Sequence, residues 1–387
     1  MDFGIGLMSY PGCWEDAAFA ERHGFSSAGF TESPVLAADP YACMAVAASL
    51  TKTVKLGVCL SIPGLRSAPT TASALATVNS IAPGRVWAGM GTGDTARKSL
   101  GLRALAAWKV RDYACEVREL LAGEEIVHRV SNAERRVRLK HPEALRVDVE
   151  SPIPIYLAAN GPKAMQAAAE GGDGLITGAV TGSAMGNAPE AFADVIATVR
   201  TAAKRSGRDL DDCYTIWPPT MCVLDEGESA VSPRALKQAG PLACLAFHLY
   251  ANDPETAAHF PPALRERLEI YDKEVLSRLD VPRELIYQEV HAGHLEFLLD
   301  GEAAVLTDEI IRMATLTGTP DEIVAQLRRL EAAGLDCLQL CVPSSSVRDV
   351  ILDVEEKIMP LMEPAAGGTE SAVRTPLTSA ARGPAAG

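Results

Sequence analysis

Residues 82–94 read Ala82-Pro83-Gly84-Arg85-Val86-Trp87-Ala88-Gly89-Met90-Gly91-Thr92-Gly93-Asp94, and this stretch is the most informative about the fold. It predicts a turn, a short apolar strand and a glycine-rich loop that opens onto a helix. The glycines stand two residues apart, so one edge of the loop carries no side chains, and backbone can approach a flat or charged ligand closely. By itself this loop is a weak ligand signal, because glycines also mark ordinary strand ends.

Short apolar strands alternate with longer helical segments on both sides of this stretch. The pattern predicts strands over residues 3–8, 27–30, 54–60, 86–89, 154–158, 173–177, 214–223 and 336–342. It predicts helices over residues 14–23, 40–50, 70–80, 108–121, 162–170, 188–205 and 320–333. Such strand–helix alternation favours a (β/α)8 TIM barrel of the α/β class. An open, doubly wound sheet is the alternative.

Three segments interrupt the alternation. Residues 126–130 and 136–139 predict a polar β-hairpin ahead of the fifth strand. A mostly helical insertion, about residues 225–318, lies between strands seven and eight, where it would form a lid or pocket wall at the C-terminal face of the barrel. Residues 363–387 are rich in Ala, Gly, Pro, Ser and Thr and are expected to be a disordered tail, which leaves residues 1–362 as one barrel unit.

Composition excludes several classes of partner. The net charge of −14 supplies no basic stripe for nucleic acid and none for an anionic membrane surface. No apolar run approaches the roughly 20 residues of a membrane-spanning helix, and the N-terminus lacks the features of a signal peptide. The 9 cysteines are scattered without regular spacing. We therefore expect a cytoplasmic protein with reduced thiols.

Several motifs, in this order along the chain, resemble those of bacterial-luciferase-like oxidoreductases. The resemblance rests on residues 20–25, 29–33, 39–40 and 51–57, on Pro83-Gly84-Arg85 with the glycine loop, and on residues 153–163 and 172–177. It implies a TIM barrel that binds reduced FMN or the deazaflavin coenzyme F420. The segments Gly91-Thr92-Gly93-Asp94 and Asn160-Gly161-Pro162-Lys163 are most similar to the F420 branch that includes the methylenetetrahydromethanopterin reductases.

The resemblance also implies which residues hold the cofactor. A non-prolyl cis peptide is expected within residues 58–61, placing Cys59, Leu60 and Ser61 against the ring. Asn160-Gly161-Pro162-Lys163 lies between a strand and a helix, so free N–H groups and the helix dipole can face a phosphate. The implied contacts are Ala158, Ala159, Asn160, Gly161 and Pro162, flanked by Thr177 and Gly178, together with Gly91, Thr92, Gly93 and Asp94 of the glycine loop. A plain turn at residues 160–163 and a helix-capping role for Asp94 are the structural alternatives.

Candidate proton-handling residues lie on the substrate side. Glu32 follows the second strand, and a carboxylate in a partly apolar pocket can act as a general acid; a surface or helix-capping glutamate is the alternative. His291 and His294 are spaced to share one helical face and to donate a proton near neutral pH, although both can equally be ordinary half-buried residues. No acidic or cysteine ligands accompany them in sequence, so no metal is expected.

Three functions follow from the resemblance. The first is F420H2-dependent hydride transfer to a small organic substrate, in which the protein supplies orientation and one proton. The second is an FMNH2-dependent two-component monooxygenase that uses O2 and receives reduced flavin from a separate reductase. The third is a non-catalytic flavin-binding protein. A homodimer formed through outer helices of the barrel is also implied.

Overall fold

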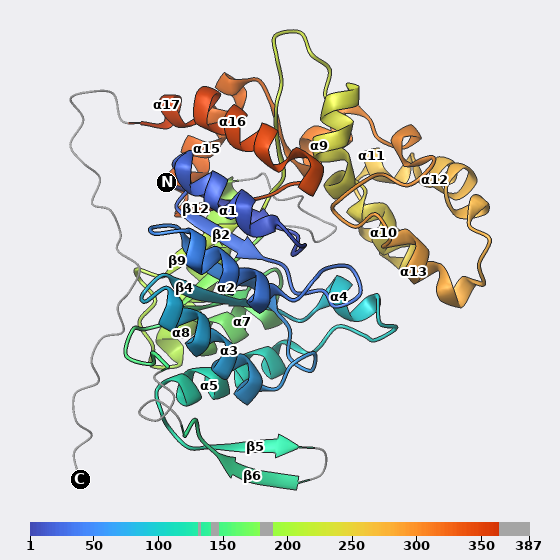
Figure 1. Cartoon of the computed structure of the whole chain (residues 1–387). Helices are drawn as coiled ribbons and strands as arrows, with labels where there is room; N and C mark the ends of the chain where they lie inside the picture. The colour runs from blue at the N-terminus through green and yellow to red at the C-terminus, as the bar shows by residue number, and fades with distance from the viewer. Residues whose placement is uncertain (131–132, 141–146, 179–188, 364–387) are drawn as a thin grey trace.

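A closed barrel of parallel strands forms the body of the protein (Figure 1). The computed structural model describes residues 1–130, 133–140, 147–178 and 189–363. The strands are hydrogen-bonded in the order β1-β12-β9-β8-β7-β4-β3-β2. They are β1 (Asp2–Leu7), β2 (Ser27–Phe30), β3 (Lys55–Ser61), β4 (Val86–Met90), β7 (Ile155–Ala158), β8 (Gly174–Ile176), β9 (Tyr214–Trp217) and β12 (Cys337–Cys341). Closure confirms the predicted TIM barrel and excludes the open sheet.

Two hydrophobic cores result from the alternation of side chains along each strand. Val86 and Ala88 of β4 belong to the large core between strands and helices, whereas Trp87 belongs to a smaller cluster with Tyr156 and Ile216. Because alternate residues point to opposite faces, this smaller cluster fills the barrel interior. Gly57 on β3 makes room for it, since an added Cβ there would lie 2.1 Å from Trp87.

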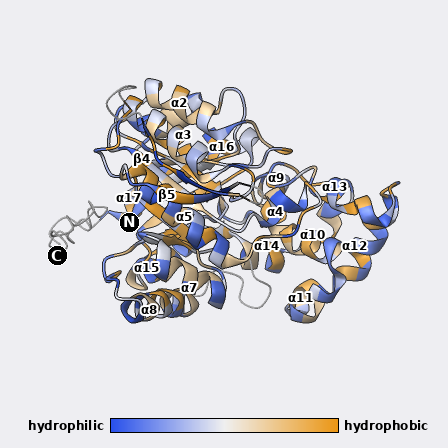
Figure 2. Cartoon of the chain, turned by 90° about the horizontal axis from the view of Figure 1, so that it is seen from below, coloured by the Kyte–Doolittle hydropathy of each residue, from blue (hydrophilic) through white to orange (hydrophobic). Residues whose placement is uncertain are grey.

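Helices cover the barrel, and several begin at proline next to a capping side chain. The Asp39 carboxylate accepts hydrogen bonds of 3.0 Å from the N–H groups of Tyr41 and Ala42 at the start of α2. Figure 2 shows hydrophobic residues in the strands and in the helices around them. The covering helices are α1 (Cys13–Arg22), α2 (Pro40–Leu50), α3 (Ala68–Ile81), α5 (Ala107–Leu121), α7 (Pro162–Gly171), α8 (Pro189–Arg205), α15 (Pro320–Ala332), α16 (Val347–Lys357) and α17 (Met359–Met362).

The predicted seventh strand, residues 214–223, is wrong beyond Trp217. Pro218 and Pro219 interrupt it, because proline has no N–H to donate to a strand ladder. The chain resumes as β10 (Met221–Val223), which leaves the barrel and pairs in parallel with β11 (Leu316–Gly318). This small separate sheet joins the two ends of the insertion.

The polar hairpin is confirmed, but its second arm lies earlier than predicted. β5 (Ile126–Val130) pairs antiparallel with β6 (Ala133–Val137), from Ile126 opposite Val137 to Val130 opposite Ala133. The apolar residues Val137 and Leu139 led the sequence pattern toward residues 136–139, whereas the register is set by the short connection between the strands.

The insertion between β10 and β11 is mostly helical, as predicted, and lies beside the barrel in Figures 1 and 2. It has a hydrophobic core of its own, in which the Phe247 and Tyr271 rings stack with centroids 5.2 Å apart. Its α-helices are α9 (Pro233–Ala243), α10 (Leu245–Asn252), α11 (Pro262–Arg265), α12 (Leu268–Glu274), α13 (Ile286–Val290) and α14 (Asp308–Ala314). Its short 3-10 helices are Pro254–His259, Leu276–Arg278, Arg283–Leu285 and Glu302–Ala304.

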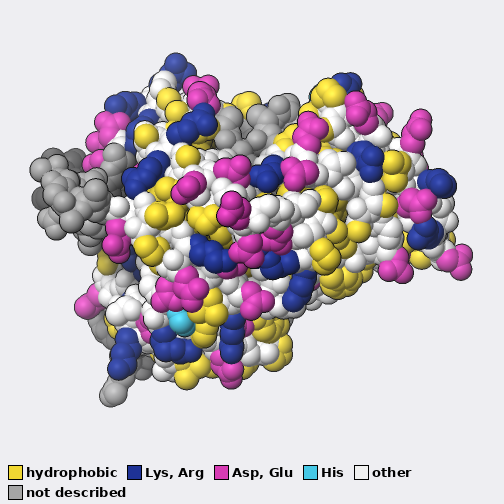
Figure 3. All heavy atoms as spheres, turned by 90° about the horizontal axis from the view of Figure 1, so that it is seen from above, with side chains coloured by type: hydrophobic (Ala, Val, Ile, Leu, Met, Phe, Trp, Pro, Cys, Tyr) yellow, Lys and Arg dark blue, Asp and Glu magenta, His cyan; other side chains and the backbone are white. Residues whose placement is uncertain are grey.

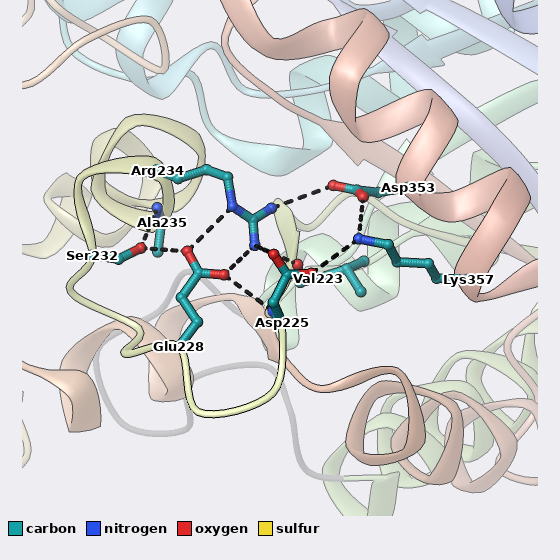
Figure 4. Close-up of polar contacts among 8 residues, drawn as sticks. All are labelled: Val223, Asp225, Glu228, Ser232, Arg234, Ala235, Asp353 and Lys357. Atoms are coloured by element: carbon teal, nitrogen blue, oxygen red, sulfur yellow. Dashed lines mark hydrogen bonds and ion pairs between the residues drawn. The ribbon is translucent and has the colours of Figure 1, made fainter.

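Arg234 ties the insertion to the barrel (Figure 4). From the first turn of α9 its guanidinium pairs with Glu228, lies 3.4 Å from Asp353 on α16, and donates to the Val223 carbonyl at 2.8 Å. Lys357, one turn further along α16, pairs with Asp353 at 2.8 Å. The Arg234–Asp353 pair joins residues 119 positions apart in sequence.

Two further expectations from the sequence concern a disordered tail and the lack of membrane-spanning helices. The predicted disordered tail, residues 363–387, lies outside the described residues except for Glu363. Among the helices that the structure describes, none combines the length and the apolar character that crossing a membrane requires.

Candidate functional site

The C-terminal ends of the barrel strands bring the predicted site residues to one face. In a parallel barrel these ends point the same way, and active sites are built there. Glu32 follows β2, Ser61 ends β3, and the glycine loop follows β4. Residues 159–162 follow β7, and Thr177 follows β8. Segments that are distant in sequence are therefore neighbours around one rim.

The end of β3 carries the expected non-prolyl cis peptide, between Cys59 and Leu60. Cys59 and Leu60 are half-buried and Ser61 is buried. The glycine loop packs against this segment: a Cβ at Gly91 would lie 2.6 Å from Leu60, and one at Gly93 would lie 2.4 Å from Ile62. Gly93, at φ 75° and against Ile62, therefore favours glycine for a reason inside the protein, whereas at Gly91 only the end of the flexible Leu60 side chain would have to move.

A short helix, α4 (Asp94–Lys98), follows the glycine loop. Its N-cap is Gly93, at φ 75°, and the cap receives no side-chain hydrogen bond. The capping role considered for Asp94 is therefore wrong. Asp94 is the first helical residue, exposed, and its carboxylate pairs with Lys98 at 2.7 Å. Thr92, half-buried, precedes it and faces the same rim.

The start of α7 is an open backbone end. Gly161 is its N-cap, Pro162 is its first residue, and no side chain caps it. An added Cβ at Gly161 would meet nothing within 4 Å in the part of the chain that the structure describes. The Asn160 side-chain oxygen accepts a hydrogen bond from the Gly178 N–H at 3.0 Å and lies 3.5 Å from the Thr177 hydroxyl. The residues predicted to flank a phosphate are thus brought together.

This open end fits a phosphate-bearing cofactor. The first N–H groups of a helix lack partners within the helix, and its dipole favours an anion there. Here the backbone is accessible, since Gly161 carries no side chain and Pro162 is exposed. Ala158 is half-buried and Ala159 is buried, with the Ala159 N–H held by the Ile176 carbonyl at 2.9 Å. The two alanines therefore shape the floor beneath the open end.

Glu32 is buried, with 4% of its surface exposed, so a surface or helix-capping role does not hold. Its carboxylate accepts hydrogen bonds from the Ser61 hydroxyl at 3.0 Å and the Ile62 N–H at 2.9 Å. The Arg66 guanidinium donates a third at 2.8 Å. These three donors occupy both oxygens of the carboxylate. Glu32 thereby fixes the segment that carries the cis peptide.

Arg66 and Tyr41 complete this buried network. The Arg66 guanidinium lies 4.8 Å from the centroid of the Tyr41 ring and also pairs with Asp39. The Tyr41 hydroxyl donates to Ser61 at 3.1 Å, and burial raises the pKa of Tyr41. Tyr41 therefore stays neutral and acts as a hydrogen-bond donor. Sequence reasoning missed Tyr41, although its place at the start of α2 brings it to this rim.

The two predicted histidines lie together but do not share a helix. α13 ends at Val290, and Gly293 and Leu295, the latter at φ 60°, break any helical continuation. The ring centroids of His291 and His294 are nevertheless 5.7 Å apart. Burial and neighbouring charge lower the pKa of His291 to about 4 and that of His294 to about 3, so both rings are neutral at pH 7.

His248 on α10 joins the pair, which the sequence pattern did not indicate. Its ring lies 5.8 Å from that of His291. One ring nitrogen from each of His248, His291 and His294 lies within 4.8 Å of the others. The expectation of no metal rested on the lack of a further ligand nearby in sequence. The fold supplies a third histidine, His248, from 43 residues earlier in the sequence.

Glu296 is a second carboxylate that sequence reasoning missed. One oxygen accepts hydrogen bonds from the Ser344 N–H at 2.9 Å and the Ser344 hydroxyl at 2.5 Å, just beyond β12. The other oxygen, Oε1, is buried without a hydrogen-bond partner among the described residues. Burial raises the pKa of Glu296 despite the two donors. Nothing in the local sequence Leu295-Glu296-Phe297 signals this placement, because it depends on how the insertion packs on the barrel.

The visible surface has no single sign of charge. Figure 3 shows Lys and Arg side chains interspersed with Asp and Glu over the face in view. Binding to a nucleic-acid backbone relies on a continuous basic surface. The mixed pattern agrees with a small-molecule site at the rim of the barrel.

Comparisons with known proteins agree with this architecture. A family model described as luciferase-like monooxygenase matches residues 13–337. A 5,10-methylenetetrahydromethanopterin reductase of Archaeoglobus fulgidus is 27% identical over 297 residues, covering 76% of this chain and 79% of that protein. An F420-dependent glucose-6-phosphate dehydrogenase of Nakamurella multipartita is 29% identical over 220 residues, covering 52% of this chain and 60% of that protein.

A solved structure shows the same fold. The coenzyme F420-dependent tetrahydromethanopterin reductase of Methanopyrus kandleri superposes with a TM-score of 0.64 at 18% identity, covering 94% of this chain and 99% of that one. The family match covers most of the chain, and the barrel is the one that the motifs implied. This chain therefore belongs to the luciferase-like monooxygenase family and is an oxidoreductase of that family.

Proposed function

We propose that this protein is an F420H2-dependent reductase that transfers a hydride to a small organic substrate. The observation that carries the proposal is the N-terminus of α7, where no side chain of the described residues caps the helix and Gly161 carries no side chain beside its first N–H groups. F420 and FMN both carry a phosphate on a ribityl-type chain, which suits this end. The preference for F420 is supported by the names of the reductase and dehydrogenase relatives.

Reduced F420, when bound, supplies the hydride; this chain supplies position and a proton. The N–H groups at the start of α7, with Asn160 and Thr177 beside them, would hold the phosphate. Cys59, Leu60 and Ser61 would face the ring, and the backbone of Gly91 and Thr92 would border it. The network of Glu32, Ser61 and Arg66 would hold this side of the site rigid. Rigid positioning matters because small errors in the distance between reacting atoms cost large factors in rate.

Among the described carboxylates of this rim, Glu296 is the best placed to hold the proton. Its raised pKa keeps a larger fraction protonated than an ordinary carboxyl group at the same pH. Its Oε1 is buried without a hydrogen-bond partner among the described residues, so a movement of the side chain that exposes this oxygen would let it donate to a substrate oxygen or nitrogen. Glu32, in contrast, has its oxygens occupied by three donors, so we assign it a positioning role. Contact of His291 and His294 with substrate stays a prediction from the sequence.

The alternative is an FMNH2-dependent monooxygenase, favoured by the description of the family itself. It would use O2 and depend on a separate reductase for reduced flavin. Anaerobic turnover distinguishes the two. The purified protein is mixed with reduced F420 and a panel of carbonyl, imine and alkene acceptors without O2, and oxidation of the coenzyme is followed by absorbance. Oxidation without O2 supports the reductase; oxidation that requires O2 and reduced FMN supports the monooxygenase. Retention of cofactor without turnover would support a non-catalytic binding protein.

We also propose a homodimer formed through outer helices. Val46 and Leu50 on α2 and Ile81 on α3 expose 37%, 52% and 44% of their surfaces, and α2 packs against α3. Apolar side chains gathered on neighbouring helices are typical of an interface. Light scattering after size-exclusion chromatography should give twice the chain mass of 40.9 kDa. A mass of one chain at all concentrations would contradict this.

A further inference from the structure

Three histidines of the insertion converge on one point. His248 comes from α10, and His291 and His294 come from the segment after α13. Their ligand nitrogens all lie within 4.8 Å of one another. His248 and His291 expose only 2% and 3% of their surfaces. Buried imidazoles grouped this closely need a physical explanation, because buried polar atoms are normally hydrogen-bonded.

The three Nδ1 atoms lack that explanation within the protein. Nδ1 of His248, of His291 and of His294 is buried and has no hydrogen-bond partner among the described residues. Each buried polar atom left unpaired destabilises the folded protein. Three such atoms in one cluster are a large cost, unless a group that binds all three occupies the space between them.

Two of the remaining nitrogens, Nε2 of His248 and Nε2 of His291, are held from outside the cluster. The Glu302 carboxylate, fully buried, lies 2.6 Å from His248 Nε2, and its second oxygen accepts the Leu299 N–H at 2.7 Å. This contact places the His248 proton on Nε2 and leaves Nδ1 with a lone pair. The Asn252 amide, which can present either oxygen or nitrogen, lies 3.0 Å from His291 Nε2. A carboxylate or amide behind the ring is the arrangement that orients metal-binding histidines.

We propose that His248, His291 and His294 bind one divalent transition-metal ion of the Zn²⁺ class, each through Nδ1, with the fourth position open to water. Three histidine nitrogens suit Zn²⁺ and its chemical neighbours, whereas Mg²⁺ and Ca²⁺ prefer oxygen. In a tetrahedral site with bonds of about 2.0–2.1 Å the nitrogens lie about 3.3 Å apart. Metal binding would draw the three nitrogens together from separations of up to 4.8 Å.

The site would join the two halves of the insertion next to the glycine loop. α10 and α13 already pack together, and Tyr287 of α13 lies against the loop after α4, 3.1 Å from a Cβ built at Gly101. Lys98 and Asp94 of α4 lie within electrostatic range of His291. The bound ion would therefore fix the insertion at the edge of the candidate cofactor site. This inference does not rest on the identity of the cofactor.

The test is a titration of the full-length, chelator-treated protein with Co²⁺, whose visible d–d absorption reports tetrahedral nitrogen coordination. We expect one equivalent bound per chain, displacement by Zn²⁺, and a higher unfolding temperature with metal than without it. His294→Gln should lose this absorption. The matched control is His259→Gln, an exposed histidine of the same insertion outside the cluster, which should bind as the wild type does.

A second variant distinguishes loss of metal binding from loss of folding. Glu302→Gln keeps all three ligands but removes the carboxylate behind His248, and it should weaken Co²⁺ binding about 10- to 100-fold. Circular dichroism confirms that each variant is folded. Failure of the wild-type protein to bind one equivalent of Co²⁺ or Zn²⁺ overturns the proposal. Unchanged binding in folded His294→Gln also overturns it, as does equal loss in His259→Gln.

Discussion

The Glu296 carboxylate accepts two hydrogen bonds from Ser344, one from its N–H at 2.9 Å and one from its hydroxyl at 2.5 Å. Glu296 belongs to the helical insertion and Ser344 follows the last barrel strand, so this contact joins the two parts of the chain at the rim. The second oxygen of Glu296 has no such partner among the described residues. A buried, half-satisfied carboxyl group at this position has measurable consequences.

The first consequence is a pH dependence of stability. Burial raises the pKa of Glu296 above its usual 4.5. At a pH between 4.5 and the raised pKa, the folded protein therefore binds more protons than the unfolded chain. The contribution of this group to stability is therefore greatest at low pH and falls as the pH rises through the folded pKa. Glu296→Gln should remove this fall. The unfolding temperatures of wild type and variant, measured from pH 4 to pH 8, should diverge in favour of the variant as pH increases.

Glu296→Gln also tests the proposed proton transfer. If Glu296 supplies the proton, kcat of the wild type falls as pH rises above its pKa, and the variant has low kcat at every pH. Ser344→Ala keeps the carboxyl group but removes one donor to it. Because that donor favours the ionised form, the variant should shift the pH profile upward. An unchanged kcat in Glu296→Gln would contradict the assignment.

For the Arg234–Glu228 pair, which joins the insertion to the barrel (Figure 4), we predict a stability that depends on pH in the opposite direction. The hydrogen bond from Arg234, helped by Ser232 and the Asp225 N–H, lowers the pKa of Glu228 to about 2 from 4.5. Between these values the unfolded chain binds more protons, so the stabilisation is complete above pH 4.5 and is lost as pH falls toward 2. Glu228→Gln should flatten acid unfolding in this range.

The matched control for this experiment is Glu226→Gln, an exposed glutamate two residues away. It should leave the acid limb of the stability curve unchanged, because surface charges contribute little. Acid unfolding followed by circular dichroism gives the comparison. Equal behaviour of the two variants would show that the pairing with Arg234 does not contribute to stability.

The buried network at the end of β3 predicts a large effect of Glu32. Glu32→Gln leaves the Arg66 guanidinium without its buried carboxylate. Ser61 and Ile62 donate to one oxygen of Glu32 and Arg66 donates to the other, so an amide, which has a single oxygen, cannot accept from both sides. We expect the free energy of unfolding to fall by about 1–3 kcal/mol. Asp39→Asn removes the more exposed partner of Arg66 and should cost about 1 kcal/mol or less. Urea unfolding of both variants measures the difference, and equal costs would contradict the account of this network.

Much of the barrel follows from local sequence because each strand and helix carries its own pattern. The apolar run at Val86–Met90, the proline start of α7 and the capping box at Thr319 each specify an element without distant contacts. Pro218 and Pro219 also show a limit of pattern reasoning. The apolar residues on both sides extend one strand across them, but the missing N–H groups end it.

The candidate site was predictable only where a backbone segment forms it. Gly161 and Asn160 sit in a strand–helix turn, so their neighbours in sequence indicate their role. His248 and Glu296 depend on contacts between residues 43 to 48 positions apart, made by packing of the insertion. No periodicity in sequence encodes these distances. The spacing of the glycines identifies the loop. The packing of Gly91 against Leu60 and of Gly93 against Ile62 is a contact with a segment distant in sequence, so the local pattern does not show it.

Gly161 offers a selective probe of the phosphate site. Its φ of −154° is extended backbone that any residue adopts, and an added Cβ meets no atom of the described residues within 4 Å. Gly161→Val should therefore fold with unchanged stability while its side chain occupies the space beside the open helix end. We expect cofactor affinity to fall about tenfold or more, which corresponds to about 1.4 kcal/mol or more. Equilibrium titration and thermal unfolding of the same samples separate the two effects.

The most direct measurement of the central claim is an anaerobic titration of the wild-type protein with reduced F420 and, separately, reduced FMN, followed by fluorescence. The account predicts micromolar or tighter binding of reduced F420, weaker binding of reduced FMN, and loss of F420 binding in Gly161→Val. Tighter binding of reduced FMN would contradict the reductase proposal and favour the monooxygenase. Binding of neither cofactor would contradict the assignment of the barrel rim as a cofactor site.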